Sequence, residues 1–227
     1  VAAFTATATP EVERDILSRL GLREPRLIRA SFDRPNLFYH VLPKEEPHAQ
    51  LLSFLGGHAG ESGIVYRSTR RKVEETAAFL QKKGVKAEAY HAGLPDAERM
   101  RVQEAFRRDE CPVVVATVAF GMGIDKPDVR FVAHLDLPKN VEGYYQETGR
   151  AGRDGDPAHC LLLYSAADMA QLLYFARQTE DEEQRSIAEK HAYAMLEYAE
   201  RSQCRRKALL SYFGEAFEEP NCGGCDV

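Results

Sequence analysis

Short apolar runs and amphipathic segments alternate along most of the chain. Runs rich in β-branched, aromatic and other apolar residues predict strands at 37–42, 63–67, 86–91, 112–116, 129–135 and 158–164. Helical spacing of the intervening and following segments predicts helices over 47–56, 70–83, 95–108, 139–149 and 166–177. Because strands that alternate with helices need crossover connections, the pattern predicts an α/β fold with a mostly parallel sheet.

The two ends of the chain depart from this alternation. Thr9 is a good helix N-cap and Pro10 a good first helical residue, so we expect a helix over 10–20. A turn-rich link, Ser-Phe-Asp-Arg-Pro-Asn at 31–36, then leads into the first strand. An acidic run after Gln178 opens a region with helical spacing only, over 183–213, which places a domain boundary near residue 178.

Composition narrows the class of protein. Of 227 residues, 44% are hydrophobic and 29% are charged, which is typical of a soluble globular protein. No segment approaches the roughly 20 apolar residues of a membrane span, and no signal peptide is recognisable. Five cysteines without such a signal favour a reducing compartment over a disulfide framework. The net charge of −5 argues against a histone-like nucleic-acid coat and leaves room for a local basic groove.

Basic and polar residues follow two of the predicted strands. Ligands of parallel sheets gather at the carboxyl ends of strands, where Thr69 and Arg70 begin a helix and where His91 and Gly93 follow the next strand. A helix N-terminus with arginine beside it suits a phosphodiester contact, although a solvated charged face has the same pattern. His91 would contact a backbone phosphate or find its partners inside its own loop.

A glycine-punctuated loop follows the strand at 112–116. Thr117, Gly123, Asp125 and Lys126 give this loop the groups to bind a phosphate, a sugar or a backbone. An ordinary strand-to-helix turn is the alternative. The loop matches neither G-x-G-x-x-G nor the phosphate-binding G-x-x-x-x-G-K-[ST] pattern. The chain contains no such phosphate loop elsewhere and no Asp-Glu-x-His box for magnesium.

The segment Gln-Glu-Thr-Gly-Arg-Ala-Gly-Arg at 146–153 carries the sharpest signal. Arg150 and Arg153 are three residues apart, which puts two guanidiniums on nearly one side of a helix turn or tight loop. Guanidinium matches phosphate oxygens bidentately, and the small residues around both arginines let a ligand approach. A solvated helix end is the alternative. Our hypothesis is that these arginines meet a nucleotide phosphate that another domain holds.

Three cysteines near the end of the chain have zinc-ligand spacing. Cys222 and Cys225 form a C-x-x-C pair, and Cys204 lies upstream of it. A structural zinc site takes four ligands, so the fourth would come from Asp226, His191 or a residue beyond the chain. Unrelated surface thiols are one alternative. A redox pair is another, although it would normally open a helix after a strand.

Together these segments resemble the RecQ family of DNA helicases over essentially the whole chain. Residues 5–8 resemble helicase motif III, 64–70 motif IV, 90–94 the motif after it, 116–126 motif V and 146–155 motif VI. Cys-Arg-Arg at 204–206, Tyr-Phe-Gly-Glu at 212–215 and the C-x-x-C pair resemble the RecQ zinc-binding subdomain. Motifs V and VI are shared widely among helicases. Their combination with this tail is specific to RecQ proteins.

The resemblance implies a fold and a division of the chain. It implies that residues 1–9 end a first helicase lobe and that 10–178 form a RecA-like second lobe, a parallel sheet flanked by helices. It further implies that 179–227 form a small helical zinc-binding subdomain, cut short at its end. In this family two lobes hold ATP with magnesium between them, and DNA lies across both.

The resemblance also implies roles for single residues. Arg153, with Arg150, would approach the γ-phosphate as an arginine finger, which is worth on the order of 10³–10⁵ in rate in other nucleotidases. Gly123, Asp125 and Gln146 would contact the nucleotide or couple its state to lobe closure. The single-strand DNA track would hold phosphates without reading sequence, through Thr69, Arg70, His91, Gly93, Thr117 and Lys126. Zinc would be bound by Cys204, Cys222 and Cys225.

The implied function is that of an ATP-dependent, 3′-to-5′ DNA helicase in DNA repair and recombination. Its partners would be single-stranded DNA and duplex junctions, with a monomeric core, no membrane, and a location in the cytoplasm and nucleoid or in a nucleus. Without a phosphate loop, this chain is expected not to hydrolyse ATP or unwind DNA alone. Two rival interpretations are a lobe of an RNA helicase or chromatin-type translocase, and a free-standing DNA-binding or regulatory module derived from a helicase.

Overall fold

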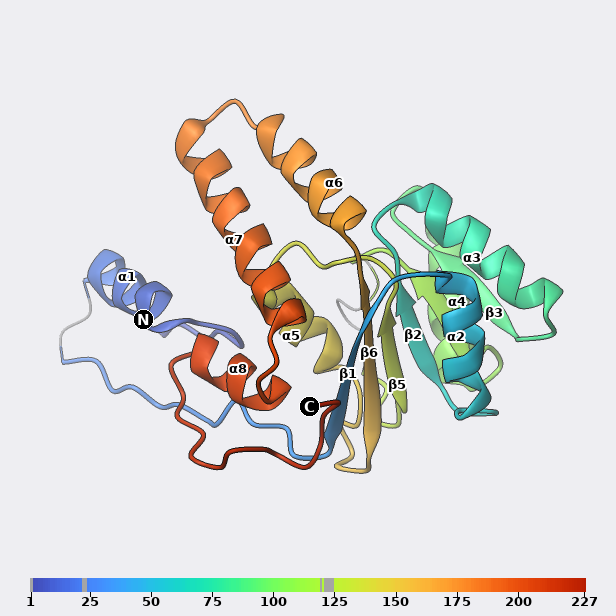
Figure 1. The fold of residues 1–227 in the computed structure, drawn as a ribbon, viewed down its shortest axis with the longest axis horizontal. Coiled ribbons are helices and arrows are strands. Elements are labelled where there is room, and N and C mark those ends of the chain that lie inside the picture. Colours follow the sequence, from blue (N-terminus) through green and yellow to red (C-terminus); the bar gives the residue numbers. More distant parts are fainter. Residues whose placement is uncertain (1, 22–23, 119, 121–124) are drawn as a thin grey trace.

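A six-stranded parallel sheet in the order β1-β6-β5-β2-β4-β3 forms the centre of the molecule (Figure 1). The computed structural model describes residues 2–21, 24–118, 120 and 125–227. The strands are β1 (Leu37–Pro43), β2 (Gly63–Tyr66), β3 (Ala87–Tyr90), β4 (Val113–Ala116), β5 (Phe131–His134) and β6 (Ala158–Tyr164). The helices are α1 (Pro10–Leu20), α2 (Pro47–Gly56), α3 (Arg70–Lys82), α4 (Asp96–Arg107), α5 (Val141–Thr148), α6 (Ala166–Arg177), α7 (Glu182–Glu200) and α8 (Arg205–Tyr212). The predicted α/β fold, with its order of elements, is confirmed.

Helices cover both faces of this sheet. On one face α2 and α3 pack through side chains such as Leu51 and Leu80. On the other face α4, α5, α7 and α8 pack through side chains such as Phe106, Tyr144 and Met195. The strands β2, β4 and β5 are buried at every position. Burial on both faces explains why their sequences are continuous apolar runs rather than alternating ones.

The carboxyl-terminal part of the chain packs on the β1 side of the sheet. The helices α6 and α7 lie side by side and extend past the sheet, and α8 returns toward β1 (Figure 1). The final segment then pairs with the edge strand: Tyr39 N–H donates to Gly224 O (3.1 Å), and Asp226 N–H donates to Tyr39 O (2.9 Å). Part of the exposed edge of β1 is therefore covered by the segment that carries the C-x-x-C pair.

Candidate functional site

The basic end of α3 and the loop after β3 meet at the carboxyl edge of the sheet. Thr69 caps α3, with its hydroxyl oxygen accepting from Lys72 N–H (3.3 Å). The Arg70 side chain lies against Gly93, where an added Cβ would come within 2.9 Å of Arg70 Nη1. Thr117 follows the neighbouring strand β4 and donates its N–H to Tyr90 O (3.2 Å). The structure therefore brings these predicted DNA-contacting residues together, because β2, β4 and β3 are adjacent strands.

His91 lies in the same group but finds its partners inside the protein. The residue is 4% exposed, and its Nε2 lies 3.0 Å from a Glu74 carboxylate oxygen. Its Nδ1 accepts from the N–H of Gly93 (3.2 Å). Of the two alternatives for His91, this geometry favours a histidine that shapes its own loop.

Lys126 lies away from this group. Its side chain is 3% exposed and forms ion pairs with Asp109 (2.6 Å) and Asp128 (3.0 Å). Asp109 also accepts from Ser62, the residue before β2, so Lys126 lies at the opposite, amino edge of the sheet. The structure does not join Lys126 to the predicted DNA-contacting residues, because two carboxylates already bind its ammonium in a buried position.

The two arginines of the 146–153 segment lie in a turn that follows α5. The helix begins at its cap Asn140, whose side-chain oxygen accepts from Gly143 N–H (2.7 Å), and ends at Thr148. We call residues 149–153 the arginine loop. Of the two predicted arrangements, a tight loop is the one observed. Arg153 is 35% exposed in its side chain.

Polar partners from distant parts of the chain approach this region. Arg153 Nη1 lies 3.3 Å from Asp125 Oδ1, which is itself nearly fully exposed. Gln146 donates through Nε2 to the hydroxyl of Thr7 (2.7 Å). The structure thus connects residues predicted to contact the nucleotide with two other predicted segments, at 5–8 and at 116–126. Gly123, a further predicted nucleotide contact, lies outside the described residues.

A buried pair supports the helix that carries Gln146. His134 at the end of β5 and Glu147 on α5 are 2.6 Å apart between Nε2 and Oε2. The Tyr66 ring stacks on His134 with 5.0 Å between centroids. Burial, and next the charge of Glu147, raise the pKa of the Tyr66 phenol, against the opposing effect of the Arg150 guanidinium beside it.

A buried ionic cluster lies beside the carboxyl ends of β2 and β5. Asp136 pairs with Lys44 (3.1 Å), Lys72 (2.9 Å) and Arg67 (3.5 Å), and it accepts from Ser68 N–H (2.9 Å). Burial raises the pKa of the Asp136 carboxyl, but these cations and the N–H outweigh burial and lower it. The cluster fixes α3 relative to the sheet, so it holds the helix end that carries Thr69 and Arg70. A cavity of about 130 Å³ adjoins it, lined in part by Thr117.

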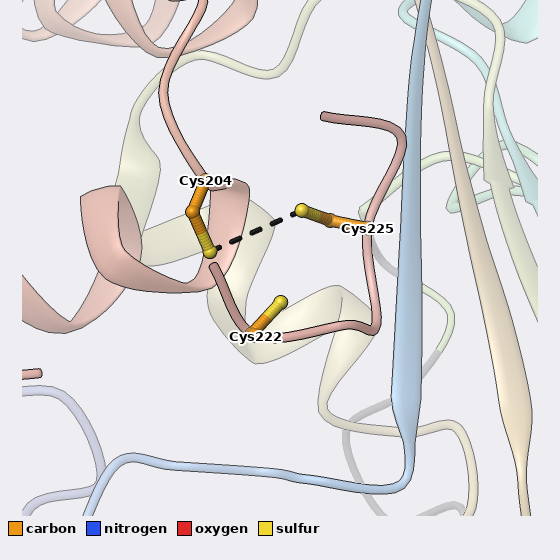
Figure 2. A group of neighbouring side chains, drawn as sticks. All are labelled: Cys204, Cys222 and Cys225. Atoms are coloured by element: carbon orange, nitrogen blue, oxygen red, sulfur yellow. Dashed lines mark hydrogen bonds between the residues drawn. The ribbon is translucent and has the colours of Figure 1, made fainter. Parts of the chain in front are cut away.

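Cys204, Cys222 and Cys225 converge on one point between α8 and the end of the chain (Figure 2). Their sulfur atoms all lie within 4.8 Å of one another, with 3.9 Å between Cys204 and Cys225. Sulfurs about 2.3 Å from a tetrahedral zinc ion are about 3.8 Å apart, so the three thiols fit such an ion. Gly223 adopts a left-handed φ of +62°, which lets the C-x-x-C pair turn both sulfurs inward.

The pKa values of two of these thiols are shifted in opposite directions. Burial raises the pKa of the Cys204 thiol, but the Lys207 N–H and the neighbouring thiols outweigh burial and lower it. Burial raises the pKa of Cys222 to about 11. Of the candidate fourth ligands, neither Asp226 nor His191 belongs to the cluster. The Asp226 carboxylate instead binds Arg205 (2.9 Å) and Val41 N–H (3.1 Å).

Two family models match successive parts of the chain. Residues 46–155 match the helicase conserved C-terminal domain, and residues 166–227 match the RecQ zinc-binding family. ATP-dependent DNA helicase RecQ of Pasteurella multocida is 49% identical over 227 residues, which is 100% of this chain. This chain belongs to the RecQ helicase family. It comprises a RecQ-type C-terminal helicase domain and zinc-binding region, and the latter together with the cysteine cluster indicates zinc.

Other relatives of this RecQ-family chain come from bacteria and eukaryotes. ATP-dependent DNA helicase RecQ of Bacillus subtilis is 41% identical over 99% of the chain, and RecQ-like DNA helicase BLM of Xenopus laevis is 46% identical over 96%. The chain spans only about a third of the bacterial relatives, 36% and 38%, and 17% of the frog protein. Among its described residues, no helix has the length and apolar character needed to cross a membrane.

Solved structures show the same fold at low identity. Dbp5 of S. cerevisiae, bound to RNA and ADP BeF3, has a TM-score of 0.62 at 19% identity, over 83% of this chain and 54% of that one. A DEAD box protein from Methanococcus jannaschii has a TM-score of 0.55 at 25% identity, over 75% and 47%. The expected RecA-like sheet with a carboxyl-terminal zinc-binding region is therefore confirmed. The zinc-binding match begins at residue 166 and includes α6, while our boundary near 178 and the assignment of residues 1–9 stay predictions.

Sequence reasoning missed several residues that hold these sites together. The buried partners are His134, Glu147 and Asp136, and each lies inside or directly after an apolar strand or within a helix. A polar residue in or directly after an apolar strand, such as His134 or Asp136, is a signal, since a buried polar group needs a partner. Glu147 gives no such signal, because a carboxylate on a helix is usually solvated. The partner itself cannot be read from the sequence, because it lies on another element.

Proposed function

We propose that this chain supplies the carboxyl-side half of the core of an ATP-dependent DNA helicase. The main support for the proposal is that polar residues from distant parts of the chain approach the arginine loop and the helix before it. Arg153 approaches Asp125, and Gln146 of the helix before the loop bonds Thr7. Two guanidiniums in one glycine-rich turn provide donors for phosphate oxygens, and the chain has no phosphate loop of its own. The nucleotide is held by a first lobe.

The proposed reaction is ATP hydrolysis, with magnesium bound chiefly by that first lobe. Arg153, with Arg150 beside it, stabilises the negative charge that develops on the transferred phosphoryl group. Gln146 and Asp125 connect the arginine loop to neighbouring segments, so closure of the two lobes brings the arginines to the phosphate. This chain's residues orient and stabilise charge, and the first lobe provides the remaining groups.

The proposed DNA track lies at the carboxyl edge of the sheet. Thr69 and Arg70 at the start of α3, with Gly93 and Thr117 from adjacent loops, hold phosphates of a single strand without reading bases. His91 positions the Gly93 loop through the bond that it accepts from Gly93 N–H. We leave Lys126 out of this track because two carboxylates bind it at the other edge.

The finer features of the function are proposals that rest on the family. They are 3′-to-5′ translocation, action in repair and recombination, single strands and duplex junctions as substrates, a monomeric core, and a location with the cell's DNA. Zinc is proposed to be held by Cys204, Cys222 and Cys225, with a fourth ligand from outside the described cluster. Its chemistry there is structural, since it ties α8 to the end of the chain.

The test compares this chain with the intact parent protein. ATP hydrolysis is measured with and without single-stranded DNA, and strand separation is measured on a duplex with a 3′ tail. We expect DNA-stimulated hydrolysis and unwinding from the intact protein and neither from the chain alone. Hydrolysis by the isolated chain, or an intact protein that binds DNA without hydrolysing ATP, would contradict the proposal.

A further inference from the structure

The link between α1 and β1 touches two sites that are far apart in the sequence. We call residues 31–37 the strap. The sequence predicts a turn-rich link at 31–36, and no helix forms there. Its side chains and carbonyls instead bond to the arginine loop on one side and to residues around α8 on the other. Such contacts span sequence separations of more than 100 residues.

On the first side, the strap holds the backbone of the arginine loop. The guanidinium of Arg34 donates to the carbonyls of Gly149 (3.2 Å), Ala151 (2.9 Å) and Gly152 (2.8 Å). These carbonyls follow the end of α5, where helical carbonyls lack partners within the helix and carry negative partial charge. A planar guanidinium meets all three at once, which a single ammonium does not do. The fixed peptides lie on both sides of Arg150 and directly before Arg153.

Asn36 holds the other end of this turn. Its Nδ2 donates to Gly152 O (2.8 Å) and to Asp156 O (2.8 Å). Gly152 has a left-handed φ of +55°, and a Cβ on it would lie 2.4 Å from the Asn36 nitrogen. A side chain at position 152 would therefore collide with the amide that holds this turn, so the position requires glycine. The side-chain directions of Arg150 and Arg153 depend on this fixed backbone.

On the second side, the carboxyl-terminal region holds the strap. Arg206, two residues after Cys204 and 5% exposed, donates to Leu37 O (2.8 Å) and pairs with Asp33 (3.3 Å). Phe32 stacks on Phe213, with 4.6 Å between centroids and 12° between planes. The N–H of Phe32 donates to the Glu215 carboxylate (2.7 Å). The strap therefore has rigid anchors beside the cysteine cluster.

We propose that Arg34 and Asn36 are positioning residues for ATP hydrolysis, and that the zinc-binding region acts on the arginine loop through the strap. The inference rests on the proposed role of Arg153. A guanidinium that stabilises a transition state must lie within a fraction of an ångström of its place, and a displacement of about 1 Å costs about 100-fold in rate. The strap keeps the arginine loop in that place. Through these contacts the strap also connects the region of the cysteine cluster to the proposed ATPase site.

The experiment uses the intact parent protein with single-stranded DNA and compares Arg34→Ala, Arg34→Lys and Asn36→Ala. We expect Arg34→Ala to lower kcat for ATP by about 10- to 100-fold while KM for ATP changes by less than about threefold. Arg34→Lys keeps the positive charge but loses the planar set of donors, so its kcat should lie between those of Arg34→Ala and the unchanged protein. Arg206→Ala should lower kcat in the same direction with zinc retained. The control is Arg29→Ala, which removes an exposed ion pair with Glu13 from the same link.

A second readout separates positioning from general structural damage. Affinity for ADP with aluminium fluoride, which mimics the transition state, should fall in Arg34→Ala while affinity for a non-hydrolysable ATP analogue is kept. Unchanged kcat in a folded Arg34→Ala protein would overturn the inference. So would equal loss of both affinities, or a failure of Arg34→Lys to recover any rate. Where Arg34→Ala does not fold, Arg34→Lys and Asn36→Ala carry the same test.

Arg153→Ala measured in parallel distinguishes the two proposals. If Arg153→Ala retains turnover, the proposed function of the arginine loop fails, whatever Arg34 does. If Arg153→Ala abolishes turnover and Arg34→Ala leaves it unchanged, only the strap inference fails.

Discussion

The imidazole Nε2 of His134 lies 2.6 Å from the carboxylate Oε2 of Glu147, and both side chains are buried. This bond joins the end of β5 to the last turn of α5, directly before the arginine loop. Glu147→Ala should lower the free energy of unfolding by about 1.5–3 kcal/mol, because it removes a charged partner and leaves a buried ring nitrogen unpaired. Urea denaturation measures this loss. Gln146→Ala, at the exposed neighbouring position, is the matched control and should cost less than about 0.5 kcal/mol.

Arg153→Ala should abolish ATP turnover in the intact protein while ATP binding survives. Removing an arginine finger costs on the order of 10³–10⁵ in rate in related chemistry, and the nucleotide itself is held by the other lobe. Steady-state hydrolysis and equilibrium binding of a fluorescent ATP analogue measure the two quantities. Arg177→Ala, at an exposed position on α6, serves as the control. Turnover within tenfold of the unchanged protein would refute the finger role.

The fold was predictable because its signals are local. Each strand is a short apolar run, each helix carries its own cap or spacing, and parallel topology follows from their alternation. Thr9 and the acidic run after Gln178 predicted where two helices begin, and the observed helices begin within two residues of those positions. The RecQ resemblance supplied the zinc-binding region, which composition alone would not have shown.

The candidate site was only partly predictable, because its supports are not local. Thr69 and Arg70 meet Gly93 as expected from strands that end at one edge. The burial of Lys126 depends on Asp109, which occupies a left-handed turn (φ +61°) before β4 and which no periodicity links to it. The bonds from Arg34 to the arginine loop likewise join residues more than 110 positions apart. Such pairings arise from packing, and packing is not visible in a linear pattern.

The cysteine cluster predicts about one zinc ion per chain in the intact protein. Cys204→Ser or Cys225→Ser should lower the metal content, and a chelator should lower the melting temperature, because metal binding contributes directly to folding in such sites. Elemental analysis and thermal denaturation measure both effects. Cys111→Ser is the control, since this buried cysteine lies outside the cluster and should leave the metal content unchanged. An intact protein without metal would refute the prediction.

Three histidines on the β1 and β6 side of the sheet predict a loss of stability in mild acid. The rings of His40 and His159 are 5.7 Å apart, and His58 lies 5.0 Å from His159. Burial lowers the pKa of His40, helped by His58 and opposed by Asp226. Burial also lowers the pKa of His159, with His58 and His40 acting in the same direction and Glu61 opposing them.

The direction of this pH dependence follows from the lowered pKa values of His40 and His159. Above the ordinary histidine pKa of about 6.5, both rings are neutral in the folded and in the unfolded chain. Their contribution to the free energy of unfolding is then fully present. As the pH falls below that value, the unfolded chain takes up protons that the folded chain resists, so the free energy of unfolding falls. Urea denaturation between pH 7.5 and 5.5, about one unit on either side of that pKa, should show this fall. His159→Gln should flatten it, whereas His191→Gln, on α7 and outside the cluster, should not. Identical pH dependence in His159→Gln and the unchanged protein would show that the cluster does not control acid stability.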